Sequence, residues 1–407
     1  MIWAGTSKNR EVQGASGITA PRVLVTEDVP SYGVLAAVRG LRASGYDPWV
    51  AVTGKPSYAA RSRACGGVVS VTNPALDPEG YATSLARQAE AVSTTAVLPG
   101  TERAIVALAG RTDRFAPTIV VGVCEPQVIR RAMDKSELVQ LGLEARLRSP
   151  PTVEVHRDAS VDLADITFPA IVKTPRKVAP ANDGHLRTFA VERVRGPAEL
   201  RRLIESSTAQ RFLVQPYISS ALEAICGVAW RGQVVCASHQ VADRIFPPDT
   251  GVSACAHTVR PDTDLERRVR KLVELIDWSG VFEVQVLRSG RRHYLIDFNP
   301  HMYGSLSLAI AAGFNLPAIW LDRMLGGTQR CGSYRVGVRY RCEERDAGSL
   351  FVAATRADWR TLVAGVPPRR HTVHAVFSMR DPLPAITSLR HLSRLRFLIS
   401  HSLAHSR

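Results

Sequence analysis

Residues 280–300 read GVFEVQVLRSGRRHYLIDFNP, and this stretch is the most informative part of the chain. Its apolar runs, Val281–Leu287 and His293–Phe298, flank a short basic turn that contains a glycine, a pattern that predicts a β-hairpin. Antiparallel strands mixed with helices indicate an α+β region around it. Further strands are expected at 170–173, 189–194, 212–216, 223–230 and 233–236. Helices are expected at 197–206, 264–277 and 308–326, the last with an interruption at its proline.

Acidic and amide side chains share one face of this hairpin. Asp297 and Asn299 are two residues apart, and Glu283 can meet them from the partner strand, because side chains alternate between the faces of a strand. Two carboxylates and an amide oxygen form a hard oxygen cluster that suits Mg²⁺ bound through substrate phosphates. The alternative interpretation is a solvent-exposed polar face on an ordinary hairpin.

Two lysines precede the hairpin in a chain where lysine is scarce, since only six of the 52 basic residues are lysines. Lys135 lies in a helix expected over 126–142, and Lys173 ends the apolar strand 170–173. A lysine in such a place can reach a phosphate as a mobile point charge. The alternative is that both are ordinary surface lysines.

A strand that runs into a turn, Leu213–Ile218, is followed five residues later by Glu223. Backbone groups at such an edge can pair with an adenine ring, and a nearby carboxylate can accept hydrogen bonds from ribose hydroxyls. Taken alone, this pattern does not identify a nucleotide site.

The region before residue 126 has a different pattern. Short apolar strands alternate with helices, which predicts a parallel sheet covered on both faces. The turn after the first strand, residues 26–33, reads TEDVPSYG and lacks the G-x-G-x-x-G of dinucleotide-binding domains. We therefore expect a sheet scaffold here rather than a dinucleotide site.

Composition excludes several classes of protein. Hydrophobic residues make up 45% and charged residues 22% of the chain, which is typical of globular proteins. No apolar run approaches the roughly 20 residues of a membrane-spanning helix, and no secretory signal is recognised. The seven cysteines are scattered, so neither a zinc site nor a disulfide framework is predicted, and free thiols in a reducing cytoplasm are the simplest interpretation.

The net charge of +15 has an uneven distribution. From Arg330 onward there are 14 arginines and five acidic residues. Residues 386–407 have leucines at helical spacing among arginines, which predicts an amphipathic helix that either packs on the protein or contacts an anionic membrane surface or a partner. No DNA- or RNA-binding module is recognised, so nucleic acid is not the predicted partner.

In order and spacing, these pieces resemble the ATP-grasp superfamily over about residues 132–326, and most closely its bacterial carboxylate–amine ligase-like members. The resemblance implies an α/β plus α+β protein, in which a Rossmann-like pre-ATP-grasp domain precedes a two-lobed ATP-grasp fold. It places a loose tail at 1–20, the α/β domain at 21–125, the ATP-grasp domain at 126–326 and a basic C-terminal region at 327–407. The implied activity is an ATP-dependent ligase that joins a small-molecule carboxylate to an amine through an acyl phosphate.

The resemblance also assigns roles to individual residues. It implies that ATP is bound with Mg²⁺, or with Mn²⁺ in its place. The segment 238–258, which contains Arg244, resembles the part of the family that lines the phosphate and substrate site. The implied ATP contacts are Lys135 and Lys173 for phosphates, Gln215, Tyr217 and Ile218 for adenine, and Glu223 for ribose. The implied metal ligands are Glu283, Asp297 and Asn299, and the implied catalytic residues are Arg244 and His301.

Several positions depart from the family pattern. The usual E-x-N-P-R string appears as Asp297-Phe-Asn-Pro-His301, so a permanent fork-shaped cation is replaced by a titratable imidazole. The segment Val214–Ile218, which resembles the hinge between the two lobes of the family, has Gln215 where glutamate is common. The usually glycine-rich loop after Lys173 has one glycine and two prolines over residues 174–184. These departures leave open a catalytically weakened protein that binds nucleotide as a sensor or scaffold.

Overall fold

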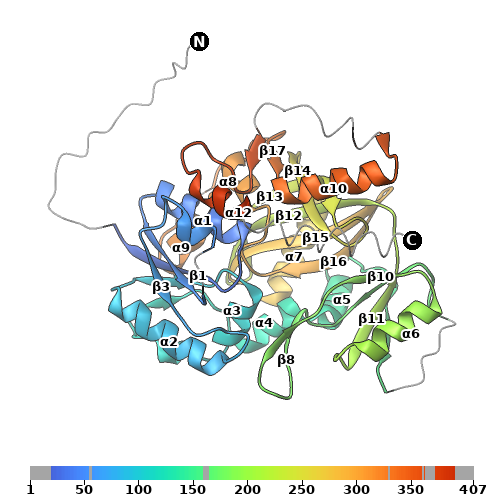
Figure 1. Ribbon diagram of the computed structural model, residues 1–407, viewed down its shortest axis with the longest axis horizontal. Coiled ribbons are helices and arrows are strands. Elements are labelled where there is room, and N and C mark those ends of the chain that lie inside the picture. Colours follow the sequence, from blue (N-terminus) through green and yellow to red (C-terminus); the bar gives the residue numbers. More distant parts are fainter. Residues whose placement is uncertain are drawn as a thin grey trace, which may run out of the picture.

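The computed structural model describes residues 20–54, 57–158, 165–328, 331–359, 362 and 372–389. Figure 1 shows three parts side by side: an α/β part near the N-terminus, a large sheet in the centre, and a small lobe that carries α6 (Pro197–Ser206). The predicted tail at 1–20 lies outside the described residues, apart from its last residue, and so does most of the predicted helix at 386–407.

The N-terminal part is a five-stranded parallel sheet in the order β3-β2-β1-β4-β5. This confirms the parallel sheet predicted from the alternation of strands and helices. The residues of β1 are almost fully buried because helices cover the sheet on both faces. The strands are β1 (Arg22–Glu27), β2 (Asp47–Val52), β3 (Gly67–Ser70), β4 (Ala96–Leu98) and β5 (Val120–Val121), and the helices are α1 (Tyr32–Ala43), α2 (Pro78–Ala91) and α3 (Glu102–Leu108).

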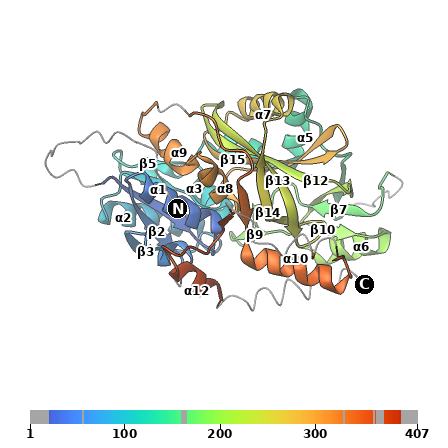
Figure 2. The same cartoon turned by 90° about the horizontal axis from the view of Figure 1, so that it is seen from above.

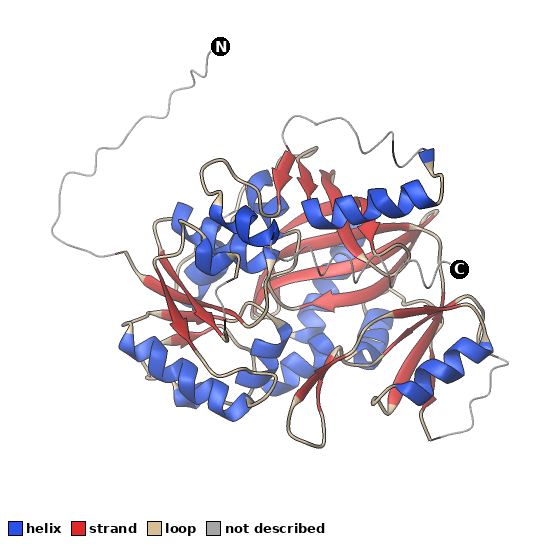
Figure 3. Cartoon of the chain, in the orientation of Figure 1, coloured by secondary structure: helices blue, strands red, loops and turns tan. Residues whose placement is uncertain are grey.

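The central sheet has seven strands in the order β16-β15-β12-β13-β14-β17-β18 (Figure 3). The predicted hairpin is its β15–β16 edge. The strand β14 was missed, and β13 is much longer than predicted. The strands are β12 (Ala221–Trp230), β13 (Gln233–Phe246), β14 (Val252–Val259), β15 (Gly280–Ser289), β16 (Arg292–Asn299), β17 (Arg339–Arg341) and β18 (Thr372–His374).

Alternation along these strands divides the core into two layers. Ile225 and Phe282 pack with the helices on one face, whereas Cys226 and Val281 pack with the helices on the other. The first face is covered by α4 (Pro126–Met133), α5 (Lys135–Glu144) and α7 (Thr263–Ile276), and the second by α1, α8 (Leu306–Ala312) and α9 (Leu316–Met324).

Two of these helix pairs were each predicted as one helical segment, the second with an interruption at its proline. The expected helix over 126–142 is broken at Asp134, whose side chain accepts a hydrogen bond from the Ser136 amide at 3.0 Å and caps α5. The expected helix over 308–326 is broken after α8 at Gly313, which has a φ of +120°. Pro317 then lies in the first turn of α9, where a missing N–H costs little.

The small lobe is a four-stranded antiparallel sheet in the order β10-β7-β11-β6, covered by α6. Leu200 and Ile204 of the helix pack against Phe212 and Val214 of the sheet. The elements are β6 (Val153–His156), β7 (Ala170–Lys173), β10 (Glu192–Val194), β11 (Arg211–Pro216) and α6 (Pro197–Ser206).

The segment after β7 does not stay within the small lobe. It forms a separate hairpin, β8 (Val178–Pro180) and β9 (Leu186–Thr188), which lies between the N-terminal part and the small lobe in Figure 1. Val178 and Leu186 join the apolar core below the parallel sheet, and the Leu186 amide donates to the Ala75 carbonyl at 2.8 Å. The glycine-poor loop is therefore anchored to the first part of the chain.

The basic C-terminal region adds β17 and β18 to the central sheet, together with α10 (Glu343–Thr355) and α12 (Leu383–Leu389). Figure 2 shows α10 along the ends of β13 and β14. Asp381 accepts hydrogen bonds from Arg39 at 2.9 Å and from Ser62 at 2.6 Å, which ties this region to the N-terminal part. The predicted domain boundaries remain predictions, but the described residues beyond 326 share a sheet with the preceding ones.

One buried carboxylate of the parallel sheet should make stability depend on pH. Burial raises the pKa of Glu27 from 4.5 to about 7, although Oε1 accepts the Ser31 amide at 3.1 Å. An acid whose pKa is raised by folding stabilises the fold below its unfolded pKa and loses that contribution as pH rises through the folded value. We therefore expect stability to fall by on the order of 3 kcal/mol between pH 4.5 and pH 8 through this residue.

Glu27→Gln keeps an acceptor for the Ser31 amide but cannot ionise. Thermal unfolding is measured at pH 5 and pH 8. At pH 5 the variant should be about as stable as the wild type, and at pH 8 it should be more stable than the wild type. Glu79→Gln, which changes an exposed carboxylate on α2, is the control and should change neither value appreciably. Equal effects of Glu27→Gln at both pH values would contradict the expectation.

Candidate active site

A cleft of about 1000 Å³ lies between the small lobe, the central sheet and α10. Ten of the eleven residues that the sequence singled out line it, and Glu223 does not. The ten are Lys135, Lys173, Gln215, Tyr217, Ile218, Arg244, Glu283, Asp297, Asn299 and His301.

The acidic face of the β15–β16 hairpin forms the floor of this cleft. Glu283 lies directly opposite Asn299, and Gln285 lies opposite Asp297. The Glu283 carboxylate accepts hydrogen bonds from the side-chain amides of Asn299 at 2.8 Å, Gln285 at 3.1 Å and Gln240 at 3.4 Å. Burial raises the pKa of Glu283 to about 7, although hydrogen bonds from Asn299 and Gln285 act in the opposite direction.

The two lysines meet the hairpin at its Asp297 end. Lys135 Nζ lies 2.8 Å from Asp297 Oδ1, and Lys173 Nζ donates to the Ile296 carbonyl at 3.0 Å. Burial and the neighbouring Lys135 lower the pKa of Lys173 to about 7. Burial would raise the pKa of Asp297, but Lys135 and Lys173 outweigh it and hold that pKa below its ordinary value. Lys173 thus extends from β7 of the small lobe and places its ammonium group against β16 of the central sheet.

The donor set of the hairpin fits a hard divalent cation. Glu283, Asp297 and Asn299 offer carboxylate and amide oxygens, which Mg²⁺ prefers, and Mn²⁺ accepts the same ligands. Among the described residues, no group of three or more His, Cys, Asp or Glu side chains could hold a metal ion. Mg²⁺ commonly binds through one or two carboxylates and completes its shell with phosphates and water, so the residues present suit that mode.

The hinge residues stand at the end of β11, where the small lobe joins the central sheet. Gln215 donates to Thr152 Oγ1 at 2.8 Å and Tyr217 donates to Asp249 Oδ1 at 2.8 Å, so both side chains are engaged within the protein. Arg193 stacks over the Tyr217 ring at 4.5 Å. The apolar side chains of Ile218 and Leu222 border the same cleft and suit a flat, apolar ring.

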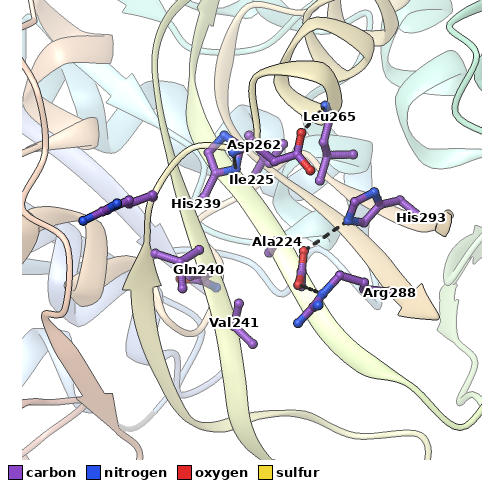
Figure 4. Close-up of a pocket in the computed structure, with 12 residues that line it drawn as sticks. Ala224, Ile225, His239, Gln240, Val241, Asp262, Leu265, Arg288 and His293 are labelled. Atoms are coloured by element: carbon purple, nitrogen blue, oxygen red, sulfur yellow. Dashed lines mark hydrogen bonds and ion pairs between the residues drawn. The ribbon is translucent and has the colours of Figure 1, made fainter. Parts of the chain in front are cut away.

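Glu223 requires a correction, because the structure does not bring it to the cleft. It lies on the opposite face of β12, where its carboxylate pairs with Arg288 and, at 3.4 Å, with His293 Nε2. Both partners are labelled in Figure 4, which shows a separate pocket of about 260 Å³ on that face, beside Asp262 and Leu265. Leu222 takes the cleft-facing position instead, so a ribose contact for Glu223 is not supported.

The two predicted catalytic residues differ in their surroundings. Arg244 is held by the buried Asp346, with Nη2 2.6 Å and Nε 2.7 Å from Oδ1. This pair neutralises the guanidinium. Burial lowers the pKa of His301, despite the nearby Glu102, so the imidazole is neutral at pH 7. Its Nδ1 is buried and has no hydrogen-bond partner in the described part of the chain.

The sequence missed contributions from both ends of the chain. Glu102, in the first turn of α3, lies 3.1 Å from Lys177 Nζ, and Lys177 outweighs the effect of burial and lowers the pKa of Glu102. At the other end, α10 brings Arg345 and Ser349 to the wall of the cleft. The sequence holds only a weak signal for either, because each is far from the hairpin along the chain.

This arrangement defines a class of fold: a small antiparallel lobe and a large sheet that enclose a cleft with lysines on one side and carboxylates on the other. A family model described as ATP-grasp in the biosynthetic pathway with Ter operon matches residues 208–345. Over these residues the chain matches the ATP-grasp family, in agreement with the resemblance recognised in its sequence. A search of curated protein sequences found no match.

Solved structures show the same fold at low sequence identity. N5-carboxyaminoimidazole synthetase from Staphylococcus aureus complexed with ADP is 13% identical, with a TM-score of 0.60, over 78% of this chain and 80% of that one. L-amino acid ligase from Bacillus licheniformis is 14% identical, with a TM-score of 0.57, over 77% and 76%. Phosphoribosylglycinamide synthetase from Anaerococcus prevotii is 12% identical, with a TM-score of 0.54, over 79% of each chain. In the described part of this chain, no helix is long and apolar enough to span a bilayer.

Proposed function

We propose that the chain is an ATP- and Mg²⁺-dependent ligase that joins a small carboxylate to an amine through an acyl phosphate. The observation that carries this proposal is the convergence of Lys135 and Lys173 with Glu283, Asp297 and Asn299 inside one cleft. The structural likeness to an enzyme named as an L-amino acid ligase supports the same class of reaction.

The chemistry follows from the poor reactivity of a carboxylate toward an amine. Bound Mg-ATP supplies the γ-phosphoryl group, which converts the carboxylate oxygen into a good leaving group and releases ADP. The amine then attacks the acyl carbon, and phosphate leaves with formation of the amide. Positioning and charge neutralisation are the protein's main tasks in such a reaction, so no nucleophilic side chain is required.

The residues of the cleft divide these tasks in the proposal. Lys135 and Lys173 offset phosphate charge, while Glu283, Asp297 and Asn299 would hold the cation. The hinge at Gln215, Tyr217 and Ile218 would pair with adenine through backbone groups. Arg244 would act through its pair with Asp346, by holding α10 against β13 and the wall of the cleft in shape.

His301 is proposed as the acceptor of the proton that the amine loses. A neutral imidazole with a free ring nitrogen can accept a proton, and His301 follows the metal-binding hairpin directly. The substituted E-x-N-P-R position would then serve proton transfer rather than anion binding.

ADP formation with a matrix of carboxylates and amines tests the proposal. We expect turnover that needs Mg²⁺, both substrates and ATP together. Mg-ATP binding without turnover on any pair would favour the alternative, a catalytically weakened protein that binds nucleotide as a sensor or scaffold. Failure to bind Mg-ATP or Mg-ADP would reject both.

A further inference from the structure

Arg345 is a cation in the cleft that forms no ion pair within the described part of the chain, although the charges of Glu344 and Glu283 act on it. It lies in the first turn of α10 and lines the cleft with Glu283, Asn299 and Gly304. None of the described carboxylates lies within ion-pair distance of its guanidinium, and no side-chain hydrogen bond to it occurs among the described residues. Partial burial of an unpaired guanidinium is costly, so an anion is expected to complete the site.

Other cations around the cleft are already engaged. Lys135 pairs with Asp297, Lys177 with Glu102, and Arg244 with Asp346. These pairs leave their charges largely neutralised before any ligand binds. Arg345 therefore differs from them in being ready to meet a negative charge without breaking an internal ion pair.

The guanidinium is held in place from two sides. It stacks over the ring of Tyr32 at 5.1 Å, and the Tyr32 hydroxyl donates to Glu344 at 2.6 Å. On the other side, a Cβ added at Gly304 would lie only 3.1 Å from Arg345 Nη1, so the absence of a side chain at 304 lets the guanidinium approach the backbone. A fixed, planar donor of this kind matches a carboxylate better than a mobile ammonium does.

Position within the cleft separates Arg345 from the lysines. Among the charges that set the pKa of Asp297 are Lys135, Lys173 and Lys177, whereas Arg345 is the cation that acts on Glu283. Lys135 and Lys173 contact the hairpin at Asp297 and Ile296, whereas Arg345 is close enough to act on both Glu283 and Lys177. Ser305 and Ser349 border the cleft near it, and the Ser305 hydroxyl accepts from Gln240 at 2.9 Å, which leaves its own O–H free to donate.

We propose that Arg345, backed by Tyr32 and Gly304, binds the carboxylate of the acceptor substrate at the Glu283 end of the cleft. The proposal rests on the ligase function and deepens it, because it names the group that would hold the substrate to be phosphorylated. In this proposal the lysines bind the phosphates and the Arg345 guanidinium binds the carboxylate. The two reactants would then lie next to each other over the cleft-facing side of the same hairpin.

Carboxylate binding to the full chain tests this assignment without turnover. Acetate, malonate and phosphonoacetate are titrated by calorimetry, with and without Mg-ADP. We expect at least one of them to bind the wild type, and Arg345→Met to weaken that binding about tenfold or more. Arg345→Lys should fall in between, because it keeps the charge but loses the fork. Mg-ADP affinity of Arg345→Met should stay within about twofold of the wild type.

Two further variants separate a binding role from a structural one. Gly304→Ala keeps the charge but displaces the guanidinium, so it should also weaken carboxylate binding. Arg288→Met removes a guanidinium on the other face of the sheet and should leave it unchanged. Equal carboxylate affinity in the wild type and Arg345→Met, or no binding of any of the three probes to the wild type, would overturn the proposal. If the wild type does not bind Mg-ADP, the ligase function is rejected instead. The titrations without nucleotide would still decide the role of Arg345.

Discussion

Glu283→Gln is expected to lower Mg²⁺-dependent ADP formation about a hundred- to a thousandfold, with Asp297→Asn close behind. Each change removes a charge that the proposed metal site needs and keeps the shape of the side chain. The fold should survive Glu283→Gln, since the carboxylate is surrounded by side-chain amides, and burial already raises its pKa to about 7. Asp297→Asn should also destabilise the protein, because it leaves Lys135 without its partner.

Nucleotide binding gives a readout that needs no acceptor substrate. The affinity for ADP should rise with added Mg²⁺ in the wild type and show little response in Glu283→Gln. Glu223→Gln is the matched control, because it changes a carboxylate on the opposite face of the same sheet and should leave the Mg²⁺ response intact. A Glu283→Gln variant that responds to Mg²⁺ as the wild type does would remove the metal assignment.

The hairpin could be predicted from the sequence because its information is local. Alternation along two adjacent strands is enough to place Glu283, Asp297 and Asn299 on one face, and the structure has this arrangement. The lysines follow from the resemblance and the scarcity of lysine. The contacts of the lysines could not be predicted, because Lys173 lies in the sheet of the small lobe and Ile296 in the central sheet.

Glu223 shows how a strand register limits such predictions. A shift of one residue moves every side chain of a strand to the other face, and Glu223 is preceded directly by Leu222. Charge favoured Glu223, but the pairing of β12 with β15 puts its carboxylate away from the cleft. Only the sheet as a whole fixes that register.

The C-terminal contribution could not be predicted for a different reason. β17 is a strand of three residues, and it pairs with β14, more than 80 residues earlier in the chain. Such a short strand has no distinctive periodicity, and its pairing is set by the sheet edge that β14 leaves open. The excess of arginine in this region suggested a separate basic segment, whereas Arg345 acts as part of the cleft wall.

Lys173→Met is expected to raise the dissociation constant for Mg-ADP about ten- to a hundredfold. The ammonium is buried at the end of β7, where it spans from the small lobe to the Ile296 carbonyl beside Asp297. Methionine has a similar length and keeps the apolar packing of the stem, so the change removes mainly the charge and its hydrogen bonds. The variant should also be no less stable than the wild type, because burial lowers the pKa of Lys173 to about 7 and makes the charged form costly to hold.

Calorimetric titration with Mg-ADP, beside thermal unfolding without ligand, measures both effects. Lys271→Met is the matched control, since this lysine lies on α7 outside the cleft and pairs with Glu274 at 2.9 Å. Its nucleotide affinity should equal that of the wild type. If Lys173→Met binds Mg-ADP as tightly as the control does, the phosphates do not lie against the small lobe. The two lysines that then remain near this part of the hairpin in the described chain, Lys135 and Lys177, are already paired with Asp297 and Glu102.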